Sequence, residues 1–217
     1  MAPHHVPMTV LGAGLLWFGW FGFNAGSALG ANGLAGMAFV NTNTAAAAAA
    51  LAWAVVERIH RGKSTMLGTA SGAVAGLVAI TPGAGFVTPM SALFIGLVGG
   101  SICYLAIGVI KAKLGYDDAL DAFGCHGIGG TWGALATGIF ATKSINPAGN
   151  DGLFYGNASL LGIQGISVLV TIVFTVTATF IILKVIGMVM KLRVTEEEES
   201  NGLDLSLHGE RAYSEFM

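Results

Sequence analysis

The chain has 217 residues, of which 54% are hydrophobic, 10% are charged and 33 are glycine, and its formal net charge is −2. A soluble domain carries roughly 25% charged residues, so a soluble chain of this composition would lack the polar groups to cover its surface. The composition therefore predicts a membrane protein, and the absence of a polybasic segment argues against a nucleic-acid partner.

Six apolar stretches have the length and composition expected of membrane-spanning helices, which need about 20 residues. In chain order the predicted spans are 8–29, 34–56, 66–80, 90–110, 119–141 and 160–190, the third being the shortest. Between them we predict charged loops at 57–64 and 111–118, a turn at 81–85, a polar loop at 143–156, and a polar tail after 191. The expected fold class is all-α, a polytopic helical membrane protein of about six spans.

Positive charges indicate the orientation of these spans. With six spans, the two charged loops and the tail share one side of the membrane, and they hold most of the cations: Arg58, Arg61, Lys63, Lys111, Lys113, Lys191, Arg193 and Arg211. The loops of the other side hold only Lys143. Because cytoplasmic loops are enriched in Lys and Arg, we predict that both termini and the charged loops lie in the cytoplasm.

Small residues recur within the spans. Glycines follow one another at intervals of four at Gly22–Gly26–Gly30, Gly72–Gly76, Gly96–Gly100 and Gly129–Gly133, and an alanine run occupies Ala45–Ala50. Such spacing lets helix backbones approach closely in lipid and predicts a tightly packed bundle. Cys103 and Cys125 fall inside apolar stretches, so we interpret them as small core residues and not as a disulfide framework.

One polar and aromatic face stands out in the first span. Trp20, Phe23, Asn24 and Ser27 have the spacing i, i+3, i+4, i+7 and therefore share one side of a helix. Aromatic rings attract cations, and a serine oxygen accepts a hydrogen bond from an N–H donor, so a small amine-like cation suits this face. The alternative is an interfacial aromatic belt with a serine bonded to its own helix backbone.

His126 is the one histidine that the sequence places within an apolar span, about two turns into the fifth and on the order of 12 Å from the charged loop. It either bonds across helices or lines a pore, where an imidazole exchanges protons near neutral pH. Asp121 lies near the start of the same helix, where its charge is favoured, and capping or support is its expected role.

The remaining features indicate no catalysis. His4, His5, His60 and His208 are predicted to be solvated, as is the acidic run Glu196–Glu199. No motif for a metal site, a nucleophile or a nucleotide pocket occurs in the sequence. We therefore expect no enzyme activity, no metal and no cofactor.

Several motifs resemble those of the Amt/Mep/Rh ammonium transporter family, in the family's order and over nearly the whole chain. Gly19–Ser27 reads GWFGFNAGS and resembles the signature GWFGFNxGS, and Asp121–Gly127 resembles D-x-F-G-x-H-G. Gly202–Asp204 with His208–Tyr213 resembles the C-terminal segment GLD…HGExAY. Phe39–Thr42 and Ser71–Val78 are also similar to the family.

The resemblance implies roles for these residues. Ser27 would belong to an external ammonium-recruitment site, Phe23 would be one of two gating phenylalanines, and Trp20 would line the pore. His126 would be the second member of a pair of pore histidines, and Asp121 would support its helix.

The resemblance also implies a homotrimer in the cell membrane, with a narrow apolar pore in each subunit and a C-terminus in the cytoplasm. Ammonium would be recruited outside and deprotonated, and ammonia would cross the pore. The membrane region would be 1–191 and the cytoplasmic tail 192–217, and a PII-type protein is a possible regulatory partner at the cytoplasmic face.

The sequence departs from the family in extent. Family members have about eleven spans in two inverted halves plus a final helix, and this chain resembles only the second half with that helix. The other pore histidine and gating phenylalanine belong to the first half, so we expect that this chain alone does not enclose a pore. Its loop-like start fits a truncated gene, a partial prediction or a split protein. The alternatives are an ammonium sensor or regulatory membrane subunit, and an inert fragment.

Overall fold

The computed structural model describes residues 5–211, and its regular elements in that range are all helical. The chain divides into two compact units, Met1–Val168 and Leu169–Met217. His4 and the Ala212–Tyr213 end of the C-terminal motif lie outside the described residues.

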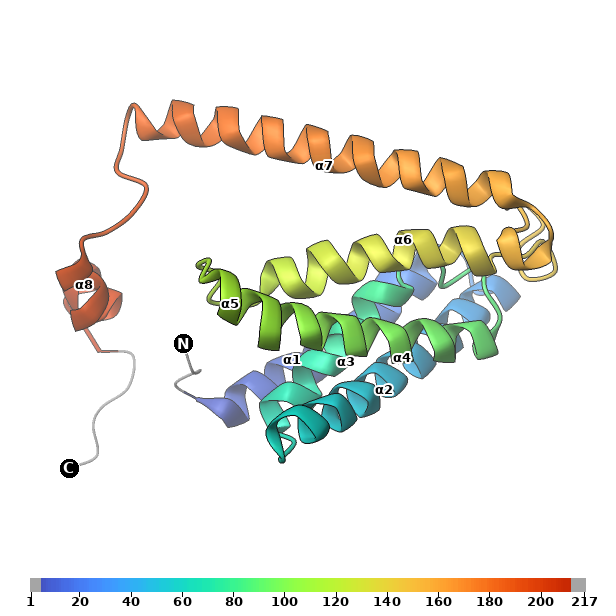
Figure 1. Ribbon diagram of the computed structural model, residues 1–217, viewed down its shortest axis with the longest axis horizontal. Coiled ribbons are helices and arrows are strands. Elements are labelled where there is room, and N and C mark those ends of the chain that lie inside the picture. The colour runs from blue at the N-terminus through green and yellow to red at the C-terminus, as the bar shows by residue number, and fades with distance from the viewer. Residues whose placement is uncertain (1–4, 212–217) are drawn as a thin grey trace. The chain divides into compact units, whose positions relative to one another are not determined.

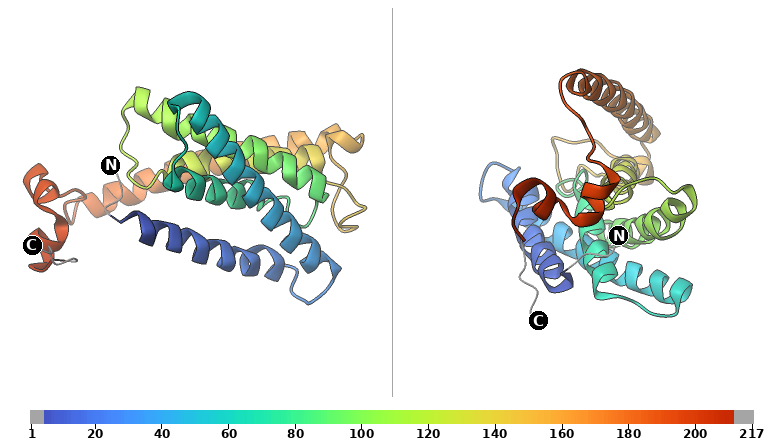
Figure 2. Two further views of the ribbon diagram at one scale, coloured as in Figure 1. Left: turned by 90° about the horizontal axis from the view of Figure 1, so that it is seen from below. Right: turned by 90° about the vertical axis from the view of Figure 1, so that its left-hand side faces the viewer.

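The first unit is a helical bundle (Figure 1). Its elements are α1 (Val6–Gly26), α2 (Gly33–Arg61), α3 (Met66–Ile80), α4 (Pro89–Leu105), the π-helical η1 (Ala106–Lys111), α5 (Ala112–Leu114), the π-helical η2 (Phe123–Ile128), α6 (Gly129–Phe140), the 3₁₀ turn η3 (Leu153–Tyr155) and the first part of α7 (Ala158–Gly187). Helix α3 contacts α1, α2, α4 and α6 and so forms the centre of the bundle (Figure 2).

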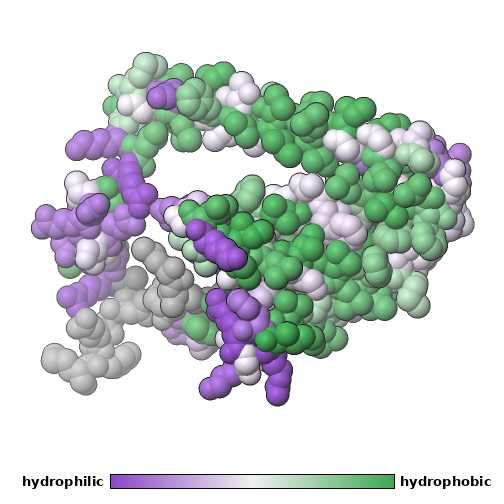
Figure 3. Space-filling model, in the orientation of Figure 1, coloured by the Kyte–Doolittle hydropathy of each residue, from purple (hydrophilic) through white to green (hydrophobic). Residues whose placement is uncertain are grey.

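The all-α membrane fold predicted from the sequence is confirmed. Within residues 5–211, four helices are long and apolar enough to cross a membrane, namely Val6–Gly26, Gly33–Arg61, Pro89–Leu114 and Ala158–Gly187. Met66–Ile80 is a shorter apolar helix, as predicted, and the fifth predicted span consists of η2 and α6, which follow each other without a break. Hydrophobic residues cover most of the surface that these helices present in Figure 3.

Polar side chains define where several helices begin. Asn32, Thr65 and Thr88 each precede a helix and accept a hydrogen bond from a backbone N–H three residues later, at Ala35, Gly68 and Ser91. Each bond satisfies one of the donors that a helix start leaves free. Helix α2 ends at Gly62, whose φ of 79° favours glycine.

The centre of the bundle is a seam of small residues. Gly72 and Gly76 of α3 and Gly96 and Gly100 of α4 lie directly against the backbone of the alanine run in α2. A Cβ atom on Gly76 would lie 2.5 Å from the Ala45 carbonyl oxygen and 2.6 Å from the Ala49 Cβ. The close packing predicted for these glycines is confirmed. Gly22 and Gly26 of α1 differ, because a Cβ atom on either would have no other atom within 4 Å.

Cys103 and Cys125 lie in a second buried cluster with Trp53, Ala75 and Tyr104. Both thiols are free, and Cys103 is 0% exposed and Cys125 6% exposed. Their interpretation as small core residues is confirmed.

The prediction of a charged loop at 57–64 is largely wrong, because α2 continues to Arg61. The Glu57 side chain is buried, and its carboxylate accepts hydrogen bonds from the backbone N–H and the hydroxyl of Thr65, at 3.0 Å each. His60 is exposed, as predicted, but it lies on α2 and not in a loop, with its Nδ1 2.7 Å from the Tyr104 hydroxyl. These contacts let charged and polar residues extend the helix beyond the apolar stretch.

The second charged loop, predicted at 111–118, lies later in the chain than expected. Lys111 ends η1 and the helix continues through Leu114, and the next helical segment begins near Phe123 and not at Ala119. His5 differs from its prediction as well, because its Nδ1 accepts the Met8 backbone N–H and caps α1.

The second unit contains the end of α7, the short helix α8 (Glu196–Asn201) and the π-helical turn η4 (Asp204–His208). The predicted acidic run is therefore helical. Its start is a capping box, in which Thr195 and Glu198 bond to each other's backbone N–H groups. These hydrogen bonds from Thr195 hold the pKa of the Glu198 carboxyl below its usual value. His208 is exposed, as predicted.

Candidate functional site

Trp20 connects the predicted aromatic face of α1 to the centre of the bundle. Its indole N–H donates to the Thr81 hydroxyl at 2.8 Å, and that hydroxyl donates to the Leu77 carbonyl at 2.7 Å. The rings of Trp20 and Phe23 meet edge to face, with centroids 5.6 Å apart. The orientation of the Trp20 ring is thus fixed by a residue distant in sequence.

Phe23, Asn24 and Ser27 line one cavity of about 360 Å³, here called the Ser27 cavity. The turn after α3 and the polar loop after α6 complete its wall, through residues that the sequence did not single out: Thr81, Phe86 and Asn146. In the sequence these residues are marked only by lying in or next to the connections between spans. That they lie close to α1 depends on the tertiary fold and could not be predicted. Three of the four predicted residues of this face are thus brought together.

Ser27 lies at the C-terminal cap of α1 and is exposed. Its hydroxyl donates to the Phe23 carbonyl at 2.6 Å, so the bond to its own helix that was the alternative interpretation is present. A hydroxyl that donates its hydrogen keeps lone pairs that accept hydrogen bonds. Ser27 therefore remains able to accept from an N–H donor, beside a Phe23 side chain that is 62% exposed.

His126 lies on η2, about one turn into the helical segment and not two as predicted. The imidazole is exposed and makes no hydrogen bond to any residue between 5 and 211. The bond across helices that would explain a structural histidine is therefore not formed within this part of the chain. His126 does not line the Ser27 cavity.

The helix that carries His126 is capped by a residue that the sequence interpretation missed. The Asp118 carboxylate accepts the backbone N–H groups of Ala122 and Phe123, both at 2.9 Å. Asp121, the predicted cap, pairs instead with Lys111 at 2.5 Å, and Lys111 also donates to the Asp118 carbonyl. The backbone of Asp121 has a φ of 56°, a value that residues other than glycine rarely adopt. This ion pair joins the start of the helix to the end of η1.

Replacing Asp118 by alanine is expected to lower the stability of the protein by about 1 kcal/mol, because two backbone donors lose their acceptor. The measurement is the melting temperature of purified protein in detergent. Asp118→Asn keeps one acceptor oxygen and serves as the matched variant, with a smaller expected loss. An alanine variant that melts with the wild type would contradict the capping role.

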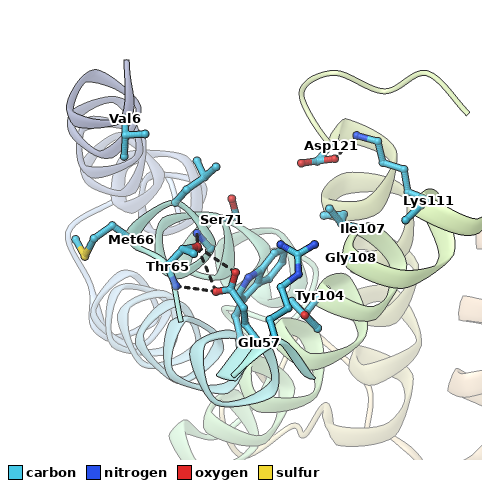
Figure 4. A pocket seen from close by; sticks show the side chains of 15 residues that line it. Val6, Glu57, Thr65, Met66, Ser71, Tyr104, Ile107, Gly108, Lys111 and Asp121 are labelled. Carbon is cyan, nitrogen blue, oxygen red and sulfur yellow. Dashed lines mark hydrogen bonds and ion pairs between the residues drawn. The ribbon is translucent and has the colours of Figure 1, made fainter. Parts of the chain in front are cut away.

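A second cavity, of about 540 Å³, lies at the other end of α1 (Figure 4). This Glu57 cavity is lined by Val6 at the start of α1, by Glu57 and Thr65, and by the Lys111–Asp121 pair on its opposite side. Helix α1 has 21 residues and is therefore about 30 Å long. In a helix that crosses the membrane, the two cavities thus belong to opposite membrane surfaces.

The Glu57 cavity also brings two of the charged regions together, since both Arg61 and Lys111 line it. This agrees with the prediction that these regions share one side of the membrane. Among residues 5–211, no three His, Cys, Asp or Glu side chains lie close enough to hold a metal ion.

The family model described as the Ammonium Transporter Family matches residues 1–213. The chain belongs to this family. A curated ammonium transporter of Bacillus subtilis (strain 168) is 58% identical over 216 residues, which cover 100% of this chain and 54% of that protein. The chain thus spans about half the length of the curated relatives it matches, as expected from its motifs.

Solved structures of the ammonium transporter family have the same fold. The crystal structure of Saccharomyces cerevisiae Mep2 superimposes with a TM-score of 0.86 at 39% identity, covering 90% of this chain and 45% of that one. A structure described as a sensor Amt protein superimposes with a TM-score of 0.84 at 38% identity, covering 94% of this chain and 49% of that one. These relatives place the chain in a family of multi-pass membrane transporters and not in an enzyme family.

Proposed function

We propose that this chain supplies the second half of an ammonium transporter, whose pore forms where it meets a first half. The observation that carries the proposal is the exposure of His126 within a segment that the sequence predicts to span the membrane. An imidazole that faces hydrocarbon is unfavourable, so such residues face protein or a water-filled path. A covering first half is consistent with relatives about twice as long.

In this function, the Ser27 cavity recruits ammonium from outside. The Ser27 oxygen accepts an N–H of the cation, and the rings of Phe23 and Trp20 stabilise its charge. Ammonium gives up one proton, which the imidazole of His126 accepts, and neutral ammonia passes Phe23, which gates the pore, and then His126. Desolvating a cation in a narrow apolar pore costs far more than desolvating ammonia. Potassium, which has no proton to release, is excluded by the same step.

The assembly proposed for this chain is a homotrimer in the cell membrane. Its membrane region is 1–191, and its tail, 192–217, lies in the cytoplasm together with the charged ends of α2 and α5. The distribution of Lys and Arg supports this orientation. A PII-type protein at the cytoplasmic face is the proposed regulatory partner.

A second candidate function is that of an ammonium sensor or regulatory membrane subunit. The similarity to the structure described as a sensor Amt protein favours it. In that case the tail, with its helix α8, would pass the signal to a cytosolic partner.

The test is methylammonium uptake in transporter-deficient cells that express this chain alone, or together with the N-terminal half of a family member. We expect uptake only when both halves are present. Uptake by the chain alone would contradict the two-half pore. Failure in both cases, with the protein confirmed in the membrane, would contradict transport and favour the sensor or an inert fragment.

A further inference from the structure

Asn41 of α2 is a fully buried amide that the proposed mechanism does not use. Its side chain is 0% exposed. The nearby residues Ala38 and Ala45 of α2 belong to the same buried cluster as Ala84 and Val87, which lie in the turn between α3 and α4. Burying an amide costs free energy unless it is hydrogen-bonded, so the partners of Asn41 indicate its role.

Both hydrogens of the Asn41 amide are donated to that turn. Its Nδ2 donates to the Ala84 carbonyl at 2.8 Å and to the Val87 carbonyl at 2.7 Å. Carbonyl oxygens only accept, so Asn41 must present its NH₂ group to the turn, and this uses both of its N–H donors. Ala84 and Val87 are themselves buried, and no backbone N–H between residues 5 and 211 donates to either carbonyl. Asn41 therefore holds the turn at two points.

The turn that Asn41 holds is one wall of the Ser27 cavity. Four of its residues line that cavity: Thr81, Ala84, Gly85 and Phe86. Asn41 does not line it. Phe86 lies between the two carbonyls that Asn41 binds, and its own carbonyl accepts the Thr142 backbone N–H at 2.9 Å. The backbone that carries the Phe86 ring is thus held from α2 and from the end of α6.

We propose that Asn41 is a positioning residue of the ammonium site, which fixes the turn 81–88 against α2 and thereby the place of the Phe86 ring in the cavity wall. The inference rests on the proposed function and adds a residue that does not touch the cation. An aromatic ring attracts a cation only within about 6 Å of its centroid. A turn free to shift would weaken that attraction and widen the cavity, so Asn41 contributes both to affinity and to the selection of small ammonium ions over bulkier ones.

The test removes the two hydrogen bonds from the turn and measures transport by the two co-expressed halves. Asn41→Leu replaces the amide by an apolar side chain of the same branching. It is expected to raise the KM for methylammonium about two- to fivefold, the effect of losing a cation–π contact, with little change in the maximal rate. The preference for methylammonium over ethylammonium is expected to fall. Phe86→Ala removes the ring itself and is expected to act similarly, and the double variant is expected to add little to either single change.

Tyr104→Phe is the matched control, because it also removes a hydrogen bond from a buried side chain. The Tyr104 hydroxyl bonds to His60 and lies beside the Glu57 cavity, not the Ser27 cavity. This variant is expected to lower the melting temperature and to keep the wild-type KM and preference. It separates the effect of a displaced turn from that of lost stability.

A wild-type KM in Asn41→Leu or in Phe86→Ala would overturn the inference. So would a rise in KM that Tyr104→Phe reproduces, because lost stability alone would then explain it. If Asn41→Leu does not accumulate in the membrane, Asn41→Asp takes its place, since it has the same shape but at most one hydrogen to donate. A wild-type KM in that variant would equally contradict the positioning role.

If the wild-type pair shows no uptake, the proposed function fails, and hydrogen exchange in the purified 217-residue chain decides the inference separately. The backbone N–H groups of 81–88 are expected to exchange faster in Asn41→Leu than in Tyr104→Phe, because only the first variant releases the turn. Equal exchange in the two variants would overturn the inference.

Discussion

A leucine in place of Gly76 is expected to leave little folded protein in the membrane. The Cβ of any side chain at this position would lie within 2.5–2.8 Å of the Ala45 carbonyl, the Ala46 Cα and the Ala49 Cβ. Two of these atoms are backbone and cannot move aside as a flexible side chain does. Overpacking a core costs about 1–3 kcal/mol and occasionally more, and contact with backbone places this variant at the upper end.

The measurement is the amount and melting temperature of monodisperse protein in detergent, by size-exclusion chromatography after heating. Gly162→Leu is the matched control, because Gly162 also lies on a helix and has open space around its Cβ position. We expect the control to behave as the wild type. A Gly76→Leu protein that melts with the control would show that α2 and α3 are not packed through this seam.

Replacing His126 by alanine is expected to reduce methylammonium uptake by the two co-expressed halves by about 10²-fold or more, or to alter its selectivity. A side chain that transfers a proton to or from a reacting group contributes on the order of 10² or more to a rate. The imidazole makes no hydrogen bond within residues 5–211, so this variant is expected to fold normally. The expected signature is therefore a defect in conduction at unchanged protein level and melting temperature.

The control is His208→Ala, since His208 is also exposed but lies in the tail. It is expected to retain wild-type uptake. If His126→Ala also retained wild-type uptake and selectivity, His126 would have only a packing role, and the proposed path of ammonia would be wrong.

The spans could be predicted from the sequence because they depend on the length of the apolar stretches. The residues at which the spans end could not be predicted in the same way. Met66–Ile80 was predicted with its observed limits, since a cap and a turn mark it on either side. The sequence predicts that this span ends before Glu57, because charged residues are typical of loops. The Glu57 carboxylate is buried against Thr65, a contact that depends on how α2 and α3 pack.

The same limit applies to the site. Helical spacing alone placed Trp20, Phe23, Asn24 and Ser27 on one face, and three of them share a cavity. The helical period could not show that Trp20 is held by Thr81, 61 residues away, or that Asn24 donates to the Thr42 hydroxyl. Whether these residues bind ammonium remains a prediction.

The seam of glycine and alanine between α2, α3 and α4 also bears on how the bundle assembles. Glycine and alanine have no rotatable side-chain torsion to immobilise, so the three helices lose almost no side-chain entropy when they meet there. Larger residues would lose up to about 2 kcal/mol each in the same position. A contact made by backbone atoms also has few alternative arrangements. The centre of this bundle is thus suited to be a rigid frame.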